Sequence, residues 1–265
     1  MTDAAELRQL AVEIAREAGE LARRRRSEGV TLAATKSSLA DIVTEADREV
    51  EALIRDRLAA ARPDDGFVGE ESGASGGRHE ITWVVDPIDG TVNYASGFPA
   101  YAVSIAAVEG GAGPASWSGV AGAIHAPVLD ETFSAARGEG ATLGRTPLRV
   151  SVDRPAGALL ATGFGYDPAT HQGDIATVAR VMPIARDLRR IGAASLDLAY
   201  VAAGRLDGYF ERGLKPWDFA AGEIIVREAG GAFERLEAGD PQRWLTLAAE
   251  PLLLAELRSR ILDQG

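Results

Sequence analysis

The segment Trp83-Val84-Val85-Asp86-Pro87-Ile88-Asp89-Gly90-Thr91 carries the densest structural and chemical signal in the chain. Its apolar half predicts a buried strand that delivers Asp86 at its carboxyl end, where Pro87 is expected to stop the strand ladder. The following residues predict a turn into a short helix, with Gly90 permitting close backbone approach. This arrangement offers two carboxylates to cations and free amides to an anion. Taken singly, each aspartate also fits a turn or a helix cap.

The composition of the 265 residues limits the classes of function. With 28 Lys and Arg against 39 Asp and Glu, the net charge is −11, which argues against nucleic acid or an anionic membrane as the main partner. The chain has no Cys and three His, which excludes disulfides, thiolate chemistry and the usual Cys/His zinc sites. A metal site must therefore use carboxylates and favour hard ions such as Mg²⁺. The absence of a long apolar run or signal-peptide pattern predicts a cytoplasmic protein.

Hydrophobic periodicity predicts an α+β half followed by an α/β half. In the first half it predicts helices over 3–26 and 44–62, and strands at 67–68, 81–85, 101–108, 120–124, 132–135 and 148–152. After about residue 155 it predicts strands at 158–162 and 208–210 and helices over 174–185, 195–203 and 217–229. No Ser/Gly/Pro-rich linker separates the halves. We therefore expect one unit of two packed lobes, approximately 1–150 and 151–265.

Further acids stand at expected strand ends and helix starts. Phe67-Val68 leads into Gly69-Glu70-Glu71-Ser72-Gly73, whose adjacent acids repel one another unless cations or solvent compensate. Lys215-Pro216-Trp217-Asp218 places another acid at the expected start of a helix, where a plain N-cap is the alternative reading. Acids delivered in this way are what a two-metal phosphoryl-transfer site requires.

Several ordered motifs together resemble one enzyme family. GEES (69–72), DPIDGTVNY (86–94) with GFP (97–99), and KPWDFAAGEIIVREAGG (215–231) resemble the inositol monophosphatase family of Mg²⁺-dependent, Li⁺-sensitive sugar phosphatases. The match begins at residues 36–38 and 41–47 and so covers most of the chain. The resemblance implies a layered αβαβα sandwich with the active site between the lobes, and a homodimer. It also implies hydrolysis of a phosphate monoester on a small polyol, with inositol 1-phosphate as the expected substrate.

The same resemblance implies the metal ligands and the catalytic groups. The expected ligands of two or three Mg²⁺ ions are Glu70, Asp86, the Ile88 carbonyl, Asp89 and Asp218, with the loosest ion near the loop that contains Lys36. Asp47 and Thr91 would, with Glu70, orient and deprotonate the attacking water. Asp47 also fits a helix capping box with Thr44, and Lys36 also fits a solvated loop lysine.

The implied substrate contacts lie in both halves of the chain. They are Ile88, Asp89, Gly90, Thr91, Gly192, Ala193, Ala194 and Glu211. The amides of Gly90 and Thr91 would receive the phosphate, and the Gly192–Ala194 turn with Glu211 would contact the sugar hydroxyls. A carboxylate at Glu211 would also repel a second phosphate. Ala193 and Ser96 stand where bacterial members often have Ser and His, which leaves the exact alcohol open.

Other functions remain as alternatives. Haloacid dehalogenase phosphatases place their second Asp two residues after the first, whereas Asp86 and Asp89 are three apart, which disfavours an aspartyl-phosphate mechanism. Histidinol-phosphate phosphatases typically show Arg-Ser-Phe where this chain has Val92-Asn93-Tyr94. Fructose-1,6-bisphosphatase and 3′-phosphoadenosine nucleotidase activities share the metal scaffold. A non-catalytic binding protein would be favoured by loss of a metal acid, and all expected acids are present. Residues 73–77 match a nucleophile elbow only formally and are expected to form a flexible loop.

Overall fold

The computed structural model describes residues 3–28, 32–35, 42–110, 113, 116–238 and 240–262. The helices are α1 (Ala4–Glu28), α2 (Glu45–Ala61), α3 (Thr91–Ser96), α4 (Pro168–Val181), α5 (Ala194–Ala202), α6 (Pro216–Glu228) and α7 (Pro251–Leu262), with a short 3₁₀ turn at Met182–Ile184. The strands of the first part are β1 (Leu32–Thr35), β2 (Ile42–Thr44), β3 (Gly66–Gly69), β4 (Gly73–Ser75), β5 (Ile81–Asp89), β6 (Ala102–Gly110), β7 (Trp117–Ala126), β8 (Glu131–Ala136), β9 (Gly140–Leu143) and β10 (Thr146–Pro147). Those of the second part are β11 (Ala158–Thr162), β12 (Ala185–Arg189), β13 (Gly208–Arg212), β14 (Ala232–Leu236) and β15 (Leu245–Ala249).

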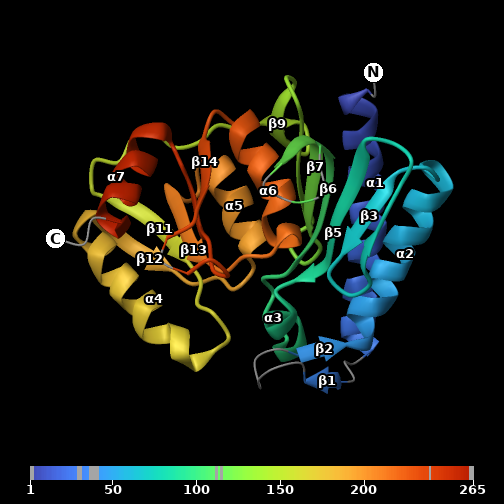
Figure 1. Cartoon of the computed structure of the whole chain (residues 1–265), viewed down its shortest axis with the longest axis horizontal. Coiled ribbons are helices and arrows are strands. Elements are labelled where there is room, and N and C mark those ends of the chain that lie inside the picture. Colours follow the sequence, from blue (N-terminus) through green and yellow to red (C-terminus); the bar gives the residue numbers. More distant parts are fainter. Residues whose placement is uncertain are drawn as a thin grey trace.

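The elements stack in alternating layers of helix and sheet (Figure 1). Helices α1 and α2 cover one face of an eight-stranded sheet of order β10-β9-β8-β7-β6-β5-β3-β4. Helices α5 and α6 lie between this sheet and a five-stranded sheet of order β12-β11-β13-β15-β14. Helices α4 and α7 cover the outer face of the smaller sheet. The αβαβα sandwich expected from the sequence is therefore confirmed. Within the described ranges, no helix is long and apolar enough to cross a membrane.

Most long elements appear where periodicity predicts them. Helix α1 begins beside Asp3, whose carboxylate accepts a hydrogen bond from the amide of Ala5 at 2.9 Å, as an N-cap does. Helix α2 ends at Ala61, shortly before Pro63, and strand β11 has the predicted bounds. The larger sheet ends at Pro147 and the smaller one begins at Ala158. The proposed division into lobes near residue 150 stays a prediction.

Four local predictions are wrong. Strand β5 continues through Pro87 to Asp89. Residues 148–152 form no strand; the buried side chains of Leu148 and Val150 reflect an extended connection between the sheets, with the Val150 amide bonded to the Ala229 carbonyl at 3.1 Å. Residues 73–75 form the edge strand β4 rather than a loop. The helix predicted at 174–185 begins earlier because Asp167 caps it ahead of Pro168, and it ends before strand β12.

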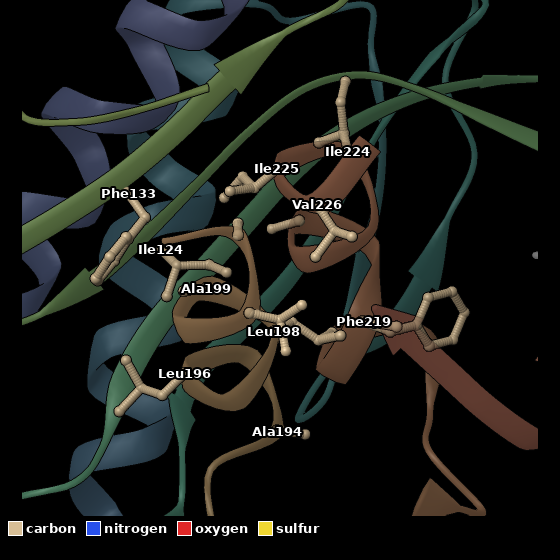
Figure 2. Packing of buried hydrophobic residues seen from close by; sticks show 14 of the residues in the cluster. Ile124, Phe133, Ala194, Leu196, Leu198, Ala199, Phe219, Ile224, Ile225 and Val226 are labelled. Atoms are coloured by element: carbon tan, nitrogen blue, oxygen red, sulfur yellow. The ribbon is translucent and has the colours of Figure 1, made fainter. Parts of the chain in front are cut away.

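The central layer is mostly apolar because both its faces meet a sheet. Every residue of α5 except Tyr200 is buried, which is the pattern of a core helix rather than a surface one. Figure 2 shows Leu198 of α5 beside Phe219 and Val226 of α6, with Ile124 and Phe133 of the larger sheet nearby. This packing fixes the N-terminal ends of α5 and α6, which carry residues of the candidate site.

Gly222 allows α6 to approach α5 closely. A Cβ at Gly222 would lie 2.6 Å from the Cβ of Leu198, so a methyl group there requires the two helices to separate. We predict that Gly222→Ala lowers the free energy of unfolding by about 1–3 kcal/mol through overpacking, although alanine has the better helix propensity. Gly173 in α4 is the matched control, since a Cβ there has no atom within 4 Å. Gly173→Ala should stabilise by about 0.5–1 kcal/mol, and urea unfolding curves measure both changes. Equal effects of the two substitutions would contradict the close helix contact.

Candidate active site

Glu70 and Asp86 are brought together by the only parallel strand pair of the larger sheet within the described residues. Strands β3 and β5 run parallel, with Gly69 opposite Val85, so the next residue of each chain segment emerges at the same edge. The amide of Glu70 donates to the Val85 carbonyl at 3.2 Å. The GEES motif and the DPIDGT motif therefore meet because the parallel pairing of β3 with β5 reaches Gly69 and Val85, the residues just before Glu70 and Asp86.

A bulge in β5 allows Asp86 and Asp89 to share one cavity. Asp86 pairs with Ser104 and Asp89 with Ala102 of β6, so three steps on one strand match two on the other. Pro87 lies within this bulge, where a residue needs no N–H for the hydrogen bonds between the strands. The strand continues past the proline for this reason, and the bulge re-aims the acids.

Gly90 has a backbone conformation that other residues avoid. Its φ of 91° is left-handed, and a Cβ would lie 3.2 Å from both the Gly192 carbonyl oxygen and the Ala193 Cβ. Glycine thus permits the start of α3 to touch the turn before α5. The predicted turn into a short helix is confirmed, and it joins the two halves of the molecule.

Asp89 caps the central helix α5 from a distance in sequence. One carboxylate oxygen accepts hydrogen bonds from the Ser195 amide at 2.7 Å and the Ser195 hydroxyl at 2.5 Å. The other accepts from the Ala194 amide at 3.2 Å. The N-cap residue of α5 is Ala193, which has no side-chain acceptor. A strand residue of the larger sheet therefore supplies the negative charge that the helix N-terminus favours.

Asp218 and Glu211 reach the site from the second half. Asp218 is the third residue of α6, and its carboxylate accepts from the Lys215 amide at 2.6 Å. Glu211 lies near the end of β13 and accepts from the hydroxyl of Tyr209 at 2.5 Å. Burial raises the pKa of Glu211 to about 7, although the Tyr209 hydrogen bond and the charge of Arg190 act in the opposite direction.

These groups line one cavity of about 600 Å³. Of the residues that the sequence implicated, the wall contains Glu70, Asp86, Ile88, Asp89, Gly90, Thr91, Gly192, Ala193, Ala194, Glu211 and Asp218. Asp47 does not line the described cavity; it is buried, and its charge raises the pKa of Asp86. The hydroxyl of Thr91 donates to the Ile88 carbonyl at 3.1 Å. Lys36 lies outside the described residues.

The cavity buries several like charges, which is costly without a cation. Desolvation holds the pKa of Asp86 well above its ordinary range, and the neighbouring charges of Glu70, Asp89 and Asp218 raise it further. Burial and the charge of Asp89 act in the same way on Asp218. Both effects favour the protonated acid, and a bound cation would relieve both.

The donor set fits a hard cation. Its atoms are carboxylate and carbonyl oxygens, which Mg²⁺ and similar ions prefer. Among the described residues, no three His, Cys, Asp or Glu side chains form a closed ligand cluster; the acids share the cavity wall and bond to backbone amides. The chemistry of these residues therefore suits a site for a hard metal ion.

Sequence reasoning missed residues that surround this site. The loop after β11 contributes Gly163, Phe164, Gly165, Tyr166 and Asp167, and Arg190, Arg212 and Arg243 also line the cavity. The loop could have been anticipated, since it follows the predicted strand 158–162 and ligands bind at the carboxyl ends of parallel strands. The arginines carry no local signal of this kind.

Glu51 of α2 is a second missed residue, and it shapes the GEES turn. Its buried carboxylate accepts from the amides of Glu71 and Ser72, each at 2.8 Å. A Cβ at Gly69 would lie 2.6 Å from the Glu51 carboxyl carbon. Glycine at this position therefore lets strand β3 pass close to the Glu51 side chain. Glu51 therefore holds the turn on which Glu70 is presented.

Comparison with known proteins assigns the family. The sequence profile of the inositol monophosphatase family matches residues 3–264. The chain belongs to this family. It is 46% identical over 245 residues to the Mycobacterium tuberculosis protein named inositol-1-monophosphatase SuhB, covering 85% of this chain and 82% of that protein. It is 40% identical over 233 residues to the Escherichia coli protein named Nus factor SuhB, covering 87% and 85%.

A solved structure agrees with this family membership. The extragenic suppressor protein SuhB from Bartonella henselae superimposes with a TM-score of 0.86 at 36% identity, covering 98% of this chain and 99% of that one. The family resemblance that the motifs indicated is therefore confirmed over the full length of the fold.

Substitution of Asp89 by asparagine has two opposite effects on stability. Relief of charge repulsion suggests that Asp89→Asn would stabilise the metal-free protein, but both carboxylate oxygens accept hydrogen bonds from α5. An asparagine would turn one NH₂ group toward these donors. We predict that Asp89→Asn lowers the free energy of unfolding in EDTA by about 1–3 kcal/mol, and that activity falls roughly 100-fold or more. An unchanged or higher stability in urea unfolding would show that repulsion outweighs the cap.

Glu51 does not line the cavity, but its substitution should affect both stability and activity. Glu51→Ala leaves two turn amides without their acceptor, and should lower the free energy of unfolding by about 2–3 kcal/mol. Activity should fall about tenfold, because the turn that carries Glu70 loses its anchor. Asp56→Ala, at an exposed position of the same helix, is the control and should change neither quantity. Calorimetry and phosphate-release assays check both, and a fully active Glu51→Ala protein would contradict this role.

Proposed function

We propose that this protein hydrolyses the phosphate monoester of a small polyol in the presence of Mg²⁺, with inositol 1-phosphate as its substrate. The observation that carries the proposal is the convergence of Glu70, Asp86, Asp89 and Asp218 from separate elements on one cavity. Membership in the inositol monophosphatase family supports the reaction class. The identities of the substrate and of the metal ion are proposed here in addition to the reaction class.

The expected metal ligands divide between the two halves of the molecule. We propose that Glu70, Asp86, the Ile88 carbonyl, Asp89 and Asp218 hold two or three Mg²⁺ ions. When bound, the ions supply an activated water and stabilise the leaving oxygen. The fold gathers these acids and so supplies the negative charge that such ions need. Burial disfavours the ionised carboxylates when no cation is bound.

The residues of the chain position the reacting groups. The amides of Gly90 and Thr91, at the start of α3, would bind the phosphate. Thr91, whose hydroxyl is oriented by its hydrogen bond to the Ile88 carbonyl, would hold the attacking water together with Asp47 and Glu70. The carboxylates of Asp47 and Glu70 would take the proton that the water loses.

The leaving alcohol would occupy the side of the cavity formed by the second half. Glu211 offers a carboxylate oxygen to sugar hydroxyls, and the hydroxyl of Tyr209 orients that carboxylate. The turn of Gly192, Ala193 and Ala194 forms the adjacent wall. A site built to bind hydroxyl groups discriminates strongly against alcohols that lack them.

Related activities and partners are secondary proposals. Histidinol phosphate and fructose 1,6-bisphosphate are alternative substrates on the same fold, and a non-catalytic binding role is the alternative of another class. The relatives named Nus factor make a transcription-related contact a further possibility for this chain. We propose a small-molecule substrate as the main ligand because of the acidic net charge, and, as expected from the sequence, a cytoplasmic location.

We also propose a homodimer. Large apolar side chains are exposed on the surface, among them Phe98, Val128 and Leu129. Phe98 and Val128 line the same surface hollow, and contiguous exposed apolar residues favour association. A mass measurement in solution tests this assignment.

The function is tested by phosphate release from a substrate panel with Mg²⁺. The panel contains inositol 1-phosphate, histidinol phosphate, fructose 1,6-bisphosphate, 3′-phosphoadenosine phosphate and p-nitrophenyl phosphate. We expect the activity to require Mg²⁺ and to be inhibited uncompetitively by millimolar Li⁺. Absence of phosphate release from every substrate would overturn the proposed function.

Glu211→Ala tests how the alcohol is bound. We predict that the kcat/KM for inositol 1-phosphate falls about tenfold relative to that for p-nitrophenyl phosphate, a differential of about 1.4 kcal/mol. The generic ester has no ring hydroxyls for Glu211 to bind. Equal losses on both substrates would mean that Glu211 supports the metal site instead, and no loss on either would mean that it does not contact the alcohol.

A further inference from the structure

The guanidinium of Arg190 lies in the wall of the candidate active site. Arg190 follows strand β12, at the edge of the smaller sheet (Figure 1), and precedes the turn at Gly192. Its side chain lines the same cavity as Glu211 and Asp89. Within the part of the chain that the structure describes, this guanidinium makes no hydrogen bond or ion pair. The preceding Arg189, in contrast, is paired with Asp187 at 2.6 Å.

Gly192 makes room for this side chain. A Cβ at Gly192 would overlap Nη1 of Arg190, so the guanidinium lies over the glycine. The φ of Gly192 is 88°, a value that also favours glycine. The turn is further fixed by Asn93, whose side-chain amide donates to the Ile191 carbonyl at 3.0 Å. Arg190 is thus held over a rigid turn that the fold places beside Gly90.

Two other arginines of the cavity are already engaged. Arg243 pairs with Asp174 at 2.9 Å, and Arg212 donates to the Ala238 carbonyl at 2.8 Å. Lys215 stands at the start of α6, next to the acids expected to hold metal. Among the described residues on the side of the alcohol, therefore, Arg190 is the cation whose donors are available to a ligand.

The charge of Arg190 acts on the acids that form this side of the cavity. Burial raises the pKa of Glu211 and that of the fully buried Asp197, and the guanidinium lowers both. Its field therefore reaches the position where Glu211 would bind the alcohol. The repulsion of a second anion, expected from Glu211 alone, is offset by an opposite charge on the same wall.

We propose that Arg190 binds a second anionic group on the leaving alcohol, so that the enzyme also accepts phosphate monoesters whose alcohol carries a phosphate or a carboxylate. A guanidinium presents a planar fork of donors that matches both groups bidentately. Glu211 would bind hydroxyls and Arg190 the anion, and together they would select a polyhydroxylated, doubly anionic substrate. This inference rests on the proposed phosphatase function.

The test compares kcat/KM for four substrates in the presence of Mg²⁺. Fructose 1,6-bisphosphate carries a second phosphate, 3-phosphoglycerate carries a carboxylate, and inositol 1-phosphate and p-nitrophenyl phosphate carry neither. The proteins are wild type, Arg190→Ala, Arg190→Lys and the control Arg189→Ala, which removes a neighbouring arginine that points into an ion pair outside the cavity wall. Size-exclusion chromatography shows whether all four share one oligomeric state.

We expect wild type to hydrolyse at least one doubly anionic substrate. In Arg190→Ala, the kcat/KM ratio of that substrate to inositol 1-phosphate should fall at least tenfold, mainly through a higher KM. Arg190→Lys should recover part of the ratio, and Arg189→Ala should keep it. A fall for phosphate but not carboxylate, or the reverse, identifies which anion is bound.

Three results would overturn the inference. They are failure of wild type to hydrolyse either doubly anionic substrate, an equal loss on all four substrates in Arg190→Ala, and an unchanged ratio in that variant. Each is distinguishable from failure of the proposed function, because that failure would abolish release from inositol 1-phosphate and p-nitrophenyl phosphate in wild type as well.

Discussion

The carboxylate of Asp89 at the N-terminus of α5 is the interaction on which the arrangement of this molecule depends. Helix α5 begins at a residue without a side-chain cap, and it lies buried between two sheets. Its first amides need an acceptor, because an unsatisfied buried N–H is costly. Asp89 supplies it from strand β5 with hydrogen bonds of 2.5–3.2 Å. The contact that closes the central layer is therefore made by a residue that also faces the cavity.

The acids around the cavity accept hydrogen bonds from backbone amides, which helps the fold to tolerate so many acids in one place. Asp89 is compensated by α5, Asp218 by an amide at the start of α6, and Glu51 by two amides of the GEES turn. Backbone dipoles thus offset part of the cost of burying negative charge. They do not remove it, since the pKa of Asp86 stays well above its ordinary range. The remaining cost is the reason that cations would bind here.

The two sides of the cavity have different chemistry. The side made by β3, β5 and α3 carries acids and free amides suited to cations and phosphate. The side made by the second half carries Arg190 and Glu211, whose carboxylate accepts a hydrogen bond from the buried Tyr209, and this mixed pair suits an alcohol with several polar substituents. Under the proposed function, the first side would carry the reaction and the second would bind the alcohol. Substrate choice would therefore be altered by substitutions near the turn at Gly192 without disturbing the acids.

The sequence by itself determined the buried strand that leads to Asp86, the turn into a short helix after Asp89, the long amphipathic helices and the acidic motifs, because each is encoded in short-range periodicity and turn chemistry. It also implied the family, and hence the layer order and the acids and turn residues of the cavity wall, although not the loop after β11 or the arginines that complete that wall. The local pattern wrongly predicted that Pro87 ends the strand, because a bulge accommodates the proline. It also wrongly predicted a strand around Leu148 and Val150, because their side chains are buried as those of a strand would be. Only the tertiary structure decided that Asp89 caps α5, that Glu51 holds the Glu70 turn and that the Arg190 guanidinium lies over Gly192 in the cavity wall. Such contacts join residues up to about a hundred positions apart, and no local pattern records them, because their energy depends on which buried donors and charges the completed fold places side by side.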